Sequence, residues 1–340
     1  MSRVEHQWPR SSLNPKYRCM PGEFMYKGNL WPSWTSEKNI KSVEDQFVFL
    51  PTDIILSGYP KSGITFLSEI TCLLHFSHGK LEYLQSAIEK VEKSQVYFRV
   101  PFIEEEWTGL FPTMTDKVQA MEYLDCLRQQ QCGNQPRLIK THLPFDSIEC
   151  ALNRLERNLR PRILYVYRNP KDVAVSMYNF YCGLQNYGPF EGDWDEFFEM
   201  WIDGWIGGGD WRKVVPPWLK QAEISEPTQM LAISYEQLVN DTEACVNNIH
   251  HFLLPETDLE PTVRQVILER TSFDKMRENK MTNYKDVEEF IPSFQFMRRG
   301  CVGDWKNWFS PEQNSRFMAA YKDTLEDLEQ FAHSHAIRFE

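Results

Sequence analysis

The segment Asp53-Ile54-Ile55-Leu56-Ser57-Gly58-Tyr59-Pro60-Lys61-Ser62-Gly63-Ile64-Thr65-Phe66 joins an apolar run to a glycine-bounded turn and the start of a helical pattern. The run at 53–57 is typical of a buried parallel strand. Residues 65–75 place apolar side chains at helical spacing. A phosphate-binding loop needs glycines for sharp turns, backbone amides that open a helix, and a lysine for the anion. This turn has all three, although an ordinary strand–helix turn is the alternative.

The lysine in this loop is not where nucleoside triphosphatases place it. Their loop reads G-x-x-x-x-G-K-[S/T], with the lysine after the second glycine. Gly58 and Gly63 keep the glycine spacing, but Ile64 follows Gly63, and Lys61 precedes it. The loop is therefore predicted to hold a phosphate-like anion with a different placement of charge.

Apolar runs recur at 138–142, 163–167 and 230–234, with helical patterns between them. After the second run, Asn169 is a good helix N-cap, Pro170 suits the first helical position, and Asp172 stands where a capping box would close. Alternating strands and helices predict an α/β fold: a single domain with a central, mostly parallel sheet flanked by helices. Residues 45–340 are assigned to this domain. Residues 1–44, rich in proline and aromatics, are predicted to form an irregular arm packed on it.

Composition excludes several classes of protein. The 340 residues include 37 basic and 48 acidic side chains, for a formal charge of −11, which argues against a nucleic-acid partner. No run approaches the roughly 18 apolar residues of a membrane span, and residues 1–7 do not begin a signal peptide. The eight cysteines form no metal-binding pattern, so we expect no metal and free thiols in a cytoplasmic protein.

Four segments together resemble the cytosolic sulfotransferases. They cover roughly residues 45–320 and occur in the family's order: Tyr59-Pro60-Lys61-Ser62-Gly63-Ile64-Thr65-Phe66, Lys140-Thr141-His142-Leu143-Pro144, Arg168-Asn169-Pro170-Lys171-Asp172-Val173-Ala174-Val175-Ser176 and Arg298-Arg299-Gly300-Cys301-Val302-Gly303-Asp304-Trp305-Lys306-Asn307. The resemblance implies a donor, 3′-phosphoadenosine 5′-phosphosulfate (PAPS), a product, 3′-phosphoadenosine 5′-phosphate (PAP), and a small-molecule acceptor.

The resemblance also implies three groups of cofactor-binding residues. The 5′-phosphosulfate group would contact Lys61, Ser62, Gly63, Thr65 and the backbone amide of Ile64. The 3′-phosphate would contact Arg168, Ser176, Arg298, Arg299 and Gly300. The adenine would contact Phe66, Tyr235, Thr271, Ser272, Phe273 and Met276.

His142 is the predicted catalytic base. It ends the predicted strand 138–142 at the carboxyl edge of the sheet, and a hydroxyl or amine acceptor needs a base with a pKa near neutrality. Lys61 would stabilise charge on the bridging oxygen as its bond to sulfur breaks. By resemblance, Lys140 would assist near the transferred group, and Ser176 would restrain Lys61 until the acceptor arrives.

The family's dimerisation motif, Lys-x-x-x-Thr-Val-x-x-x-Glu, is degraded in this chain. Lys306 is followed by Ser310, Pro311 and Ser315, and the segment 310–313 instead predicts a capped helix start. A homodimer remains open, but this route to it is doubtful.

The acceptor is not identified by these motifs. Phe102, Trp107 and Phe111 are candidates for the acceptor pocket, with core packing as the alternative. The stretch 191–210 contains seven acidic residues and no lysine or arginine. It is interpreted either as a solvated helix face or as an acidic rim that favours amine acceptors. A phosphate-loop kinase, a catalytically silent nucleotide-binding protein and a sulfonation-driven dehydratase are the remaining alternatives.

Overall fold

The central sheet has parallel strands in the order β4-β3-β5-β6. The computed structural model describes residues 10–105, 136–185, 188–285 and 290–329. The strands of this sheet are β3 (Ile54–Gly58), β4 (Leu138–Thr141), β5 (Arg162–Tyr167) and β6 (Met230–Ser234). Each coincides with a predicted apolar run within one residue at each end. The α/β prediction with a parallel sheet is therefore confirmed.

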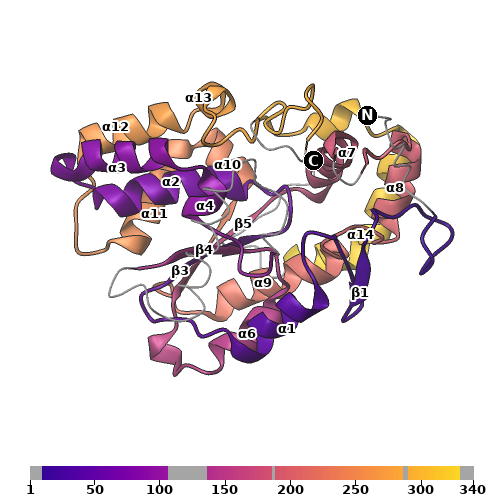
Figure 1. Ribbon diagram of the computed structural model, residues 1–340, viewed down its shortest axis with the longest axis horizontal. Coiled ribbons are helices and arrows are strands. Elements are labelled where there is room, and N and C mark those ends of the chain that lie inside the picture. The colour runs from indigo at the N-terminus through magenta and orange to yellow at the C-terminus, as the bar shows by residue number, and fades with distance from the viewer. Residues whose placement is uncertain (1–9, 106–135, 186–187, 286–289, 330–340) are drawn as a thin grey trace, which may run out of the picture.

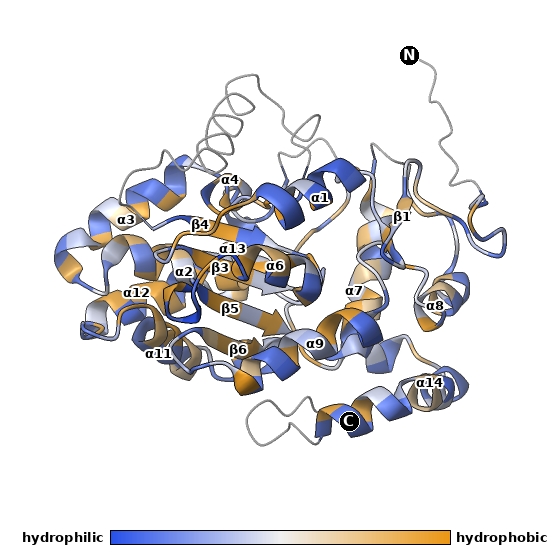
Figure 2. Cartoon of the chain, turned by 90° about the horizontal axis from the view of Figure 1, so that it is seen from below, coloured by the Kyte–Doolittle hydropathy of each residue, from blue (hydrophilic) through white to orange (hydrophobic). Residues whose placement is uncertain are grey.

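Helices cover both faces of this sheet (Figure 1). Side chains alternate along β3, so Ile54 and Leu56 pack on one face and Ile55 on the other. The first face is covered by α2 (Ile64–Ser77), α3 (Leu81–Lys93), α4 (Val96–Arg99), α11 (Thr242–Leu253) and α12 (Pro261–Arg270). The second is covered by α1 (Glu37–Gln46), α6 (Phe145–Leu152) and α9 (Trp211–Ile224). The strands are apolar and the outer helix faces polar (Figure 2).

The N-terminal segment has more regular structure than expected. β1 (Phe24–Tyr26) and β2 (Asn29–Trp31) form an antiparallel hairpin. Its turn residues Lys27 and Gly28 both have positive φ, at 49° and 75°, as tight hairpin turns require. Helix α1 then begins after the N-cap Ser36. The expectation of an irregular arm was therefore wrong, because the Lys27-Gly28 turn closes a hairpin and Ser36 caps a helix.

Helix α7 (Pro170–Gly183) begins as predicted, but without the capping box. Asn169 caps the helix by accepting from the Lys171 amide at 2.9 Å. Asp172 does not return to the Asn169 amide, which donates to Glu236 instead. Its two oxygens accept from the amides of Gly303 and Trp305, at 2.7 and 2.9 Å. The capping-box prediction was wrong, because Asp172 has long-range partners that fasten the C-terminal loop to α7.

The remaining elements lie between residues 157 and 329. They are α8 (Trp194–Ile202), α10 (Tyr235–Asn240), α13 (Phe273–Glu278), α14 (Pro311–Glu329) and the short 3-10 helices Arg157–Leu159 and Asp304–Asn307. Helix α14 has the predicted capping box, in which Ser310 and Gln313 bond reciprocally at 3.0 and 3.1 Å. No helix within the described ranges is long and apolar enough to cross a bilayer.

Candidate active site

A cavity of about 550 Å³ opens at the carboxyl edge of the sheet. Parallel strands deliver the residues that follow them to one edge, where open α/β sheets bind ligands. Most of the predicted site residues line this cavity: Lys61, Gly63, Ile64, Thr65, Phe66, His142, Arg168, Ser176, Tyr235, Thr271, Ser272, Phe273, Met276, Arg298, Arg299 and Gly300. Ser62 and Lys140 do not, because both are fully buried behind its wall.

The loop between β3 and α2 has the geometry of an anion cradle. Lys61 and Gly63 have positive φ, at 68° and 105°, which turns the chain sharply into the helix. A Cβ on Gly63 would approach the Tyr235 ring to 2.6 Å, so the loop tolerates no side chain there. The first amides of α2 have no partner within the helix and form its positive end. Within the described ranges, the buried Ser62 hydroxyl also makes no hydrogen bond.

Arg168, directly after β5, links two loops of the cavity. Its guanidinium donates to the backbone carbonyls of Lys61 at 3.4 Å and Cys301 at 3.3 Å. It also stacks over the Tyr235 ring, 4.1 Å from the ring centre. Arg168 therefore holds the phosphate-binding loop and the C-terminal loop in fixed relation, and its positive charge faces the space between them.

The C-terminal loop brings two more arginines to the same space. Arg298 and Arg299 both pair with the buried Asp304, Arg299 at 2.5 Å. Asp304 holds the two side chains at the cavity wall and offsets part of their charge. Gly300 has a φ of 64°, and a Cβ there would collide with the Phe273 ring. This position therefore requires glycine for both its backbone conformation and its packing.

His142 is oriented by the end of the neighbouring strand. Its Nδ1 lies 2.5 Å from the backbone carbonyl of Gly58. A carbonyl oxygen can only accept, so Nδ1 carries the proton and Nε2 of the neutral ring has a free lone pair. The ring stays partly exposed to the cavity. Burial lowers the pKa of His142 to about 4. The imidazole is therefore neutral and able to accept a proton near pH 7.

Glu104 is a residue of this site that sequence reasoning missed. The backbone of Pro101 and Ile103 pairs with Lys140 of β4, at 2.9 and 3.1 Å, which places Glu104 beside His142. One carboxyl oxygen accepts from the His142 amide at 2.6 Å, and the other is buried without a hydrogen bond to any residue that the structure describes. Burial raises the pKa of Glu104 to about 7. Local sequence gave no signal, because this placement depends on long-range pairing.

Comparisons with known proteins agree with this geometry. Residues 51–330 match the family described as Sulfotransferase domain. The chain is similar to sulfotransferase 1A1 of Rattus norvegicus, with 35% identity over 83% of this chain and 88% of that protein. It is also 31% identical to sulfotransferase 2A1 of Homo sapiens, over 86% of this chain and 90% of that protein. The chain belongs to the sulfotransferase family.

Solved structures share the fold of this sulfotransferase. Mouse sulfotransferase SULT7A1 complexed with PAP aligns over 92% of this chain and 99% of that chain, with a TM-score of 0.66 and 24% identity. Retinol dehydratase in a complex with retinol and PAP aligns over 88% of each chain, with a TM-score of 0.69 and 21% identity. The family assignment confirms the resemblance seen in the four motifs. The enzyme transfers a sulfuryl group from PAPS, and the phosphate-loop kinase alternative is set aside.

The cavity of this sulfotransferase fits a nucleotide that carries charge at two positions. The loop after β3 and the first amides of α2 could hold one anionic group, with the Ser62 hydroxyl beside it. Arg168 and the two loop arginines could hold a second. Asp304 is the carboxylate that pairs with Arg298 and Arg299, so positive charge remains in excess among these residues.

A group of aromatic side chains also lines the cavity. They are Trp31, Trp34, Tyr97, Phe102, Phe180, Tyr284, Phe290 and Phe296. The centre of the Phe102 ring lies 4.7 Å from that of His142, so this candidate pocket residue does reach the site. Trp107 and Phe111 lie outside the described residues. Such a lining favours an acceptor with an apolar body.

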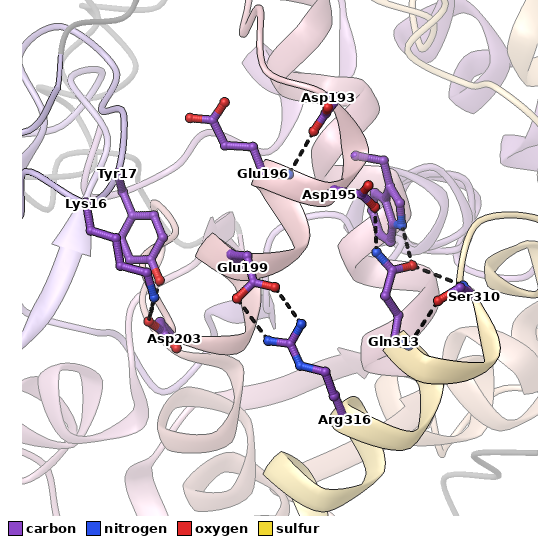
Figure 3. A network of polar contacts seen from close by, with 11 residues as sticks. Lys16, Tyr17, Asp193, Asp195, Glu196, Glu199, Asp203, Ser310, Gln313 and Arg316 are labelled. Atoms are coloured by element: carbon purple, nitrogen blue, oxygen red, sulfur yellow. Dashed lines mark hydrogen bonds and ion pairs between the residues drawn. The ribbon is translucent and has the colours of Figure 1, made fainter.

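The carboxylates of the acidic stretch 191–210 do not line the cavity of this sulfotransferase, although Gly207 and Gly208 of the same stretch do. Several of these carboxylates contact other parts of the chain instead (Figure 3). Glu199 accepts two bonds from Arg316 of α14, at 2.6 and 2.9 Å. Lys16 pairs with Asp203 at 2.8 Å, and Asp193 caps α8. The interpretation as a rim for amine acceptors was wrong, because none of the seven carboxylates lines the cavity, and Glu199 and Asp203 are paired with basic residues of the chain.

Proposed function

We propose that this sulfotransferase acts on a hydroxyl or amine of a small, largely apolar acceptor, with His142 as the general base. The observation that carries this proposal is the bond from Nδ1 of His142 to the Gly58 carbonyl. It fixes the tautomer whose Nε2 can take the proton of the acceptor. The partly exposed ring lines the cavity among the aromatic side chains, where an apolar acceptor would lie.

The other polar residues of the cavity act on the donor. PAPS supplies an activated sulfuryl group whose leaving group is the phosphate of PAP. Lys61 stabilises negative charge on the oxygen that leaves sulfur, and Ser176 restrains the Lys61 side chain. Arg168, Arg298 and Arg299 hold the 3′-phosphate, since guanidinium groups donate bidentately to phosphate. Lys140 contributes positive potential from behind the wall, because its Nζ is buried above the Phe102 ring.

The remaining part of the donor site is the surface that contacts the adenine. Phe66, Phe273 and Met276 supply apolar surface for the base, and Thr271 and Ser272 supply polar groups beside it. Tyr235 packs against Gly63 and beneath Arg168, so its ring supports the phosphate sites as well as the base.

The oligomeric state and location also belong to this proposal. Ser310 and Gln313 cap α14, and Gln313 further bonds Asp195 at 2.8 Å and Trp194 at 3.2 Å. Because these groups are used within the chain, we expect no dimer through residues 306–315, which light scattering of the purified protein would test.

We assign the protein to the cytoplasm, with residues 45–340 as its catalytic domain and 1–44 packed on it. The six cysteines in the described ranges are free thiols, in keeping with a reducing compartment.

A labelled-donor assay tests the proposal. The enzyme is incubated with ³⁵S-labelled PAPS and a panel of phenols, alcohols, steroids and amines, with and without EDTA. Transfer of label to an acceptor, insensitive to EDTA, is expected. His142→Ala should lower kcat by at least about 10²-fold, because the base is lost, while PAP binding by calorimetry persists. Full activity of His142→Ala would refute the assignment of the base.

The same assay addresses the two remaining alternatives. In a sulfonation-driven dehydratase, label ends as inorganic sulfate and the acceptor loses water. In a silent nucleotide-binding protein, PAP binds but no label moves for any acceptor. The proposed reaction leaves the label on the acceptor.

A further inference from the structure

Lys61 contacts two aromatic rings in the cavity. Its Nζ lies 3.8 Å from the centre of the Phe296 ring and 4.6 Å from that of Phe180. Phe180 is on α7, and Phe296 is in the loop that leads to Arg298. No carboxylate pairs with Lys61 in the part of the chain that the structure describes. The face of an aromatic ring carries negative potential and attracts a cation. These two rings are therefore the contacts that favour a charged Lys61.

Neighbouring rings fix the two phenylalanines. Phe296 packs against Tyr284 with ring centres 4.2 Å apart, and Phe180 lies edge-on to Trp34 at 5.9 Å. Phe290 contacts both, at 6.0 Å from Phe296 and 5.7 Å from Phe180. Rings held on several sides have few alternative rotamers, so they can define the position of a flexible lysine.

The helix geometry places this contact beside the reaction. Ser176 and Phe180 are four residues apart on α7, which puts them on one face of the helix, and both line the cavity. The titratable groups that interact electrostatically with the Lys61 ammonium are Arg168, after β5, and the neutral His142, after β4. Both lie at the same sheet edge as Lys61, and a positive Arg168 opposes a second positive charge there.

We propose that Phe180 and Phe296 are positioning residues that keep the Lys61 ammonium charged and in place for sulfuryl transfer. This inference rests on the proposed function, in which Lys61 stabilises the leaving oxygen. A neutral or displaced amine could not do so. Burial, followed by the charge of Arg168, lowers the pKa of Lys61 to about 7, so part of the protein loses this charge near neutral pH. The rings oppose that loss.

Fluorination of the two rings tests the proposal without changing their shape. Phenylalanines with one, two or three fluorines are placed at position 180 or 296 of the full chain, since each fluorine weakens the attraction for a cation. The pKa of Lys61 is followed by NMR of ¹³Cε-labelled lysine, with its signal assigned by Lys61→Arg. The pKa should fall with each fluorine, because the charged form loses support. At saturating substrates, kcat should fall in parallel, by up to about tenfold over the series.

A matched pair outside the cavity provides the control. Lys90 Nζ lies 5.1 Å from the centre of the Phe76 ring, and fluorination of Phe76 should change neither the Lys61 pKa nor kcat. PAP affinity by calorimetry should stay within about twofold in all variants at pH 5, where Lys61 is charged in each of them. Phe296→Leu should lose at least as much kcat as the trifluorinated ring, whereas Phe296→Tyr should retain most of it.

Two results would overturn the proposal. An unchanged Lys61 pKa and kcat across the fluorinated series would show that the rings do not support the ammonium. A change confined to the KM of the acceptor would show that they are only walls of its pocket. An unmodified enzyme that transfers no label to any acceptor would instead refute the proposed function, and the Lys61 pKa series would still test the contact between rings and amine.

Discussion

The acidic face of α8 and the cationic cavity differ in whether their charged side chains have partners of opposite charge within the chain. On α8, Arg316 hydrogen-bonds Glu199 and lowers the pKa of that carboxyl. At Asp203, burial raises the pKa, but the hydrogen bonds from Lys16 and Tyr17 outweigh it, so the pKa is lowered. Each of these carboxylates is stabilised in its charged form by a partner from another part of the chain. The charges of these two carboxylates are therefore compensated without a bound ligand.

In the cavity and behind its wall, burial works against the charged forms of two lysines. It lowers the pKa of Lys61, in the cavity, to about 7 and that of Lys140, behind the wall, to about 8. Neither amine forms an ion pair within the described ranges. A buried cation without a counter-ion raises the free energy of the folded state, which an anionic ligand can offset. Sites that bind charged ligands can therefore be recognised by charge that the fold leaves uncompensated, and the number of charged residues is a poor guide.

Replacing one lysine from each region gives the largest expected contrast. Lys61→Met should lower kcat by about 10²–10³-fold, because it removes charge stabilisation at the leaving oxygen. Lys16→Met removes a lysine of the same chemistry that pairs with Asp203 on the surface, and kcat should not change. Steady-state assays with labelled PAPS measure both. Equal losses of kcat in the two variants would show that the cavity lysine matters no more for catalysis than the paired surface lysine.

The sequence was sufficient where the signal is local. Four apolar runs predicted the strands β3 to β6, and the glycines around Lys61 predicted the sharp turn between β3 and α2. Residues that directly follow strands, such as His142 and Arg168, were correctly expected at one sheet edge, because parallel strands end there.

Partners distant in the chain could not be predicted. Asp172 looked like a capping residue but bonds the loop at Gly303, 131 residues away. Glu104 reaches His142 through backbone pairing along β4. The α8 carboxylates appeared unopposed because their basic partners, including Lys16 and Arg316, lie outside 191–210.

The pH dependence of kcat/KM for the donor should show the separate titrations of His142 and Lys61. His142, with a pKa of about 4, must be neutral, and Lys61, with a pKa of about 7, must be charged. The profile should therefore be flat between these values and fall about tenfold per pH unit on either side. The alkaline decline of kcat should occur at higher pH, because the bound donor's negative charge raises the Lys61 pKa.

Lys61→Arg is the control for this profile. An arginine stays charged throughout the range, so the variant should lose the alkaline decline even if its overall rate is lower. An alkaline decline that persists in Lys61→Arg would assign it to another group. Lys16→Met should retain both declines.

The buried Glu104 carboxyl should make the free energy of unfolding depend on pH. Burial raises its folded pKa to about 7 from an ordinary 4.5. The folded chain then binds a proton that the unfolded chain releases, so the free energy of unfolding falls as pH rises from 4.5 to 7. His142 gives the opposite slope, because its folded pKa is depressed. Glu104→Gln should remove the Glu104 contribution, about 2–3 kcal/mol across this window, in urea unfolding at several pH values.

The α8 face provides the control for this measurement. Glu199→Gln removes a carboxyl whose pKa is lowered, so its effect lies below pH 4.5, and the slope from 4.5 to 7 should match that of the unmodified enzyme. If Glu104→Gln also kept the slope, the Glu104 carboxyl would be charged in the folded chain at neutral pH.

The Glu199–Arg316 pair should have the smallest effect. Its side chains are 37% and 45% exposed, so water and salt weaken their attraction. A double-mutant cycle of Glu199→Gln and Arg316→Gln, measured by urea unfolding, should give a coupling of about 0.2–1 kcal/mol that shrinks with added salt. All three variants should retain the kcat of the unmodified enzyme for neutral and amine acceptors alike. A selective loss of amine turnover in Glu199→Gln would instead mean that this face does influence the acceptor, and the separation between a self-paired surface and an uncompensated cavity would fail.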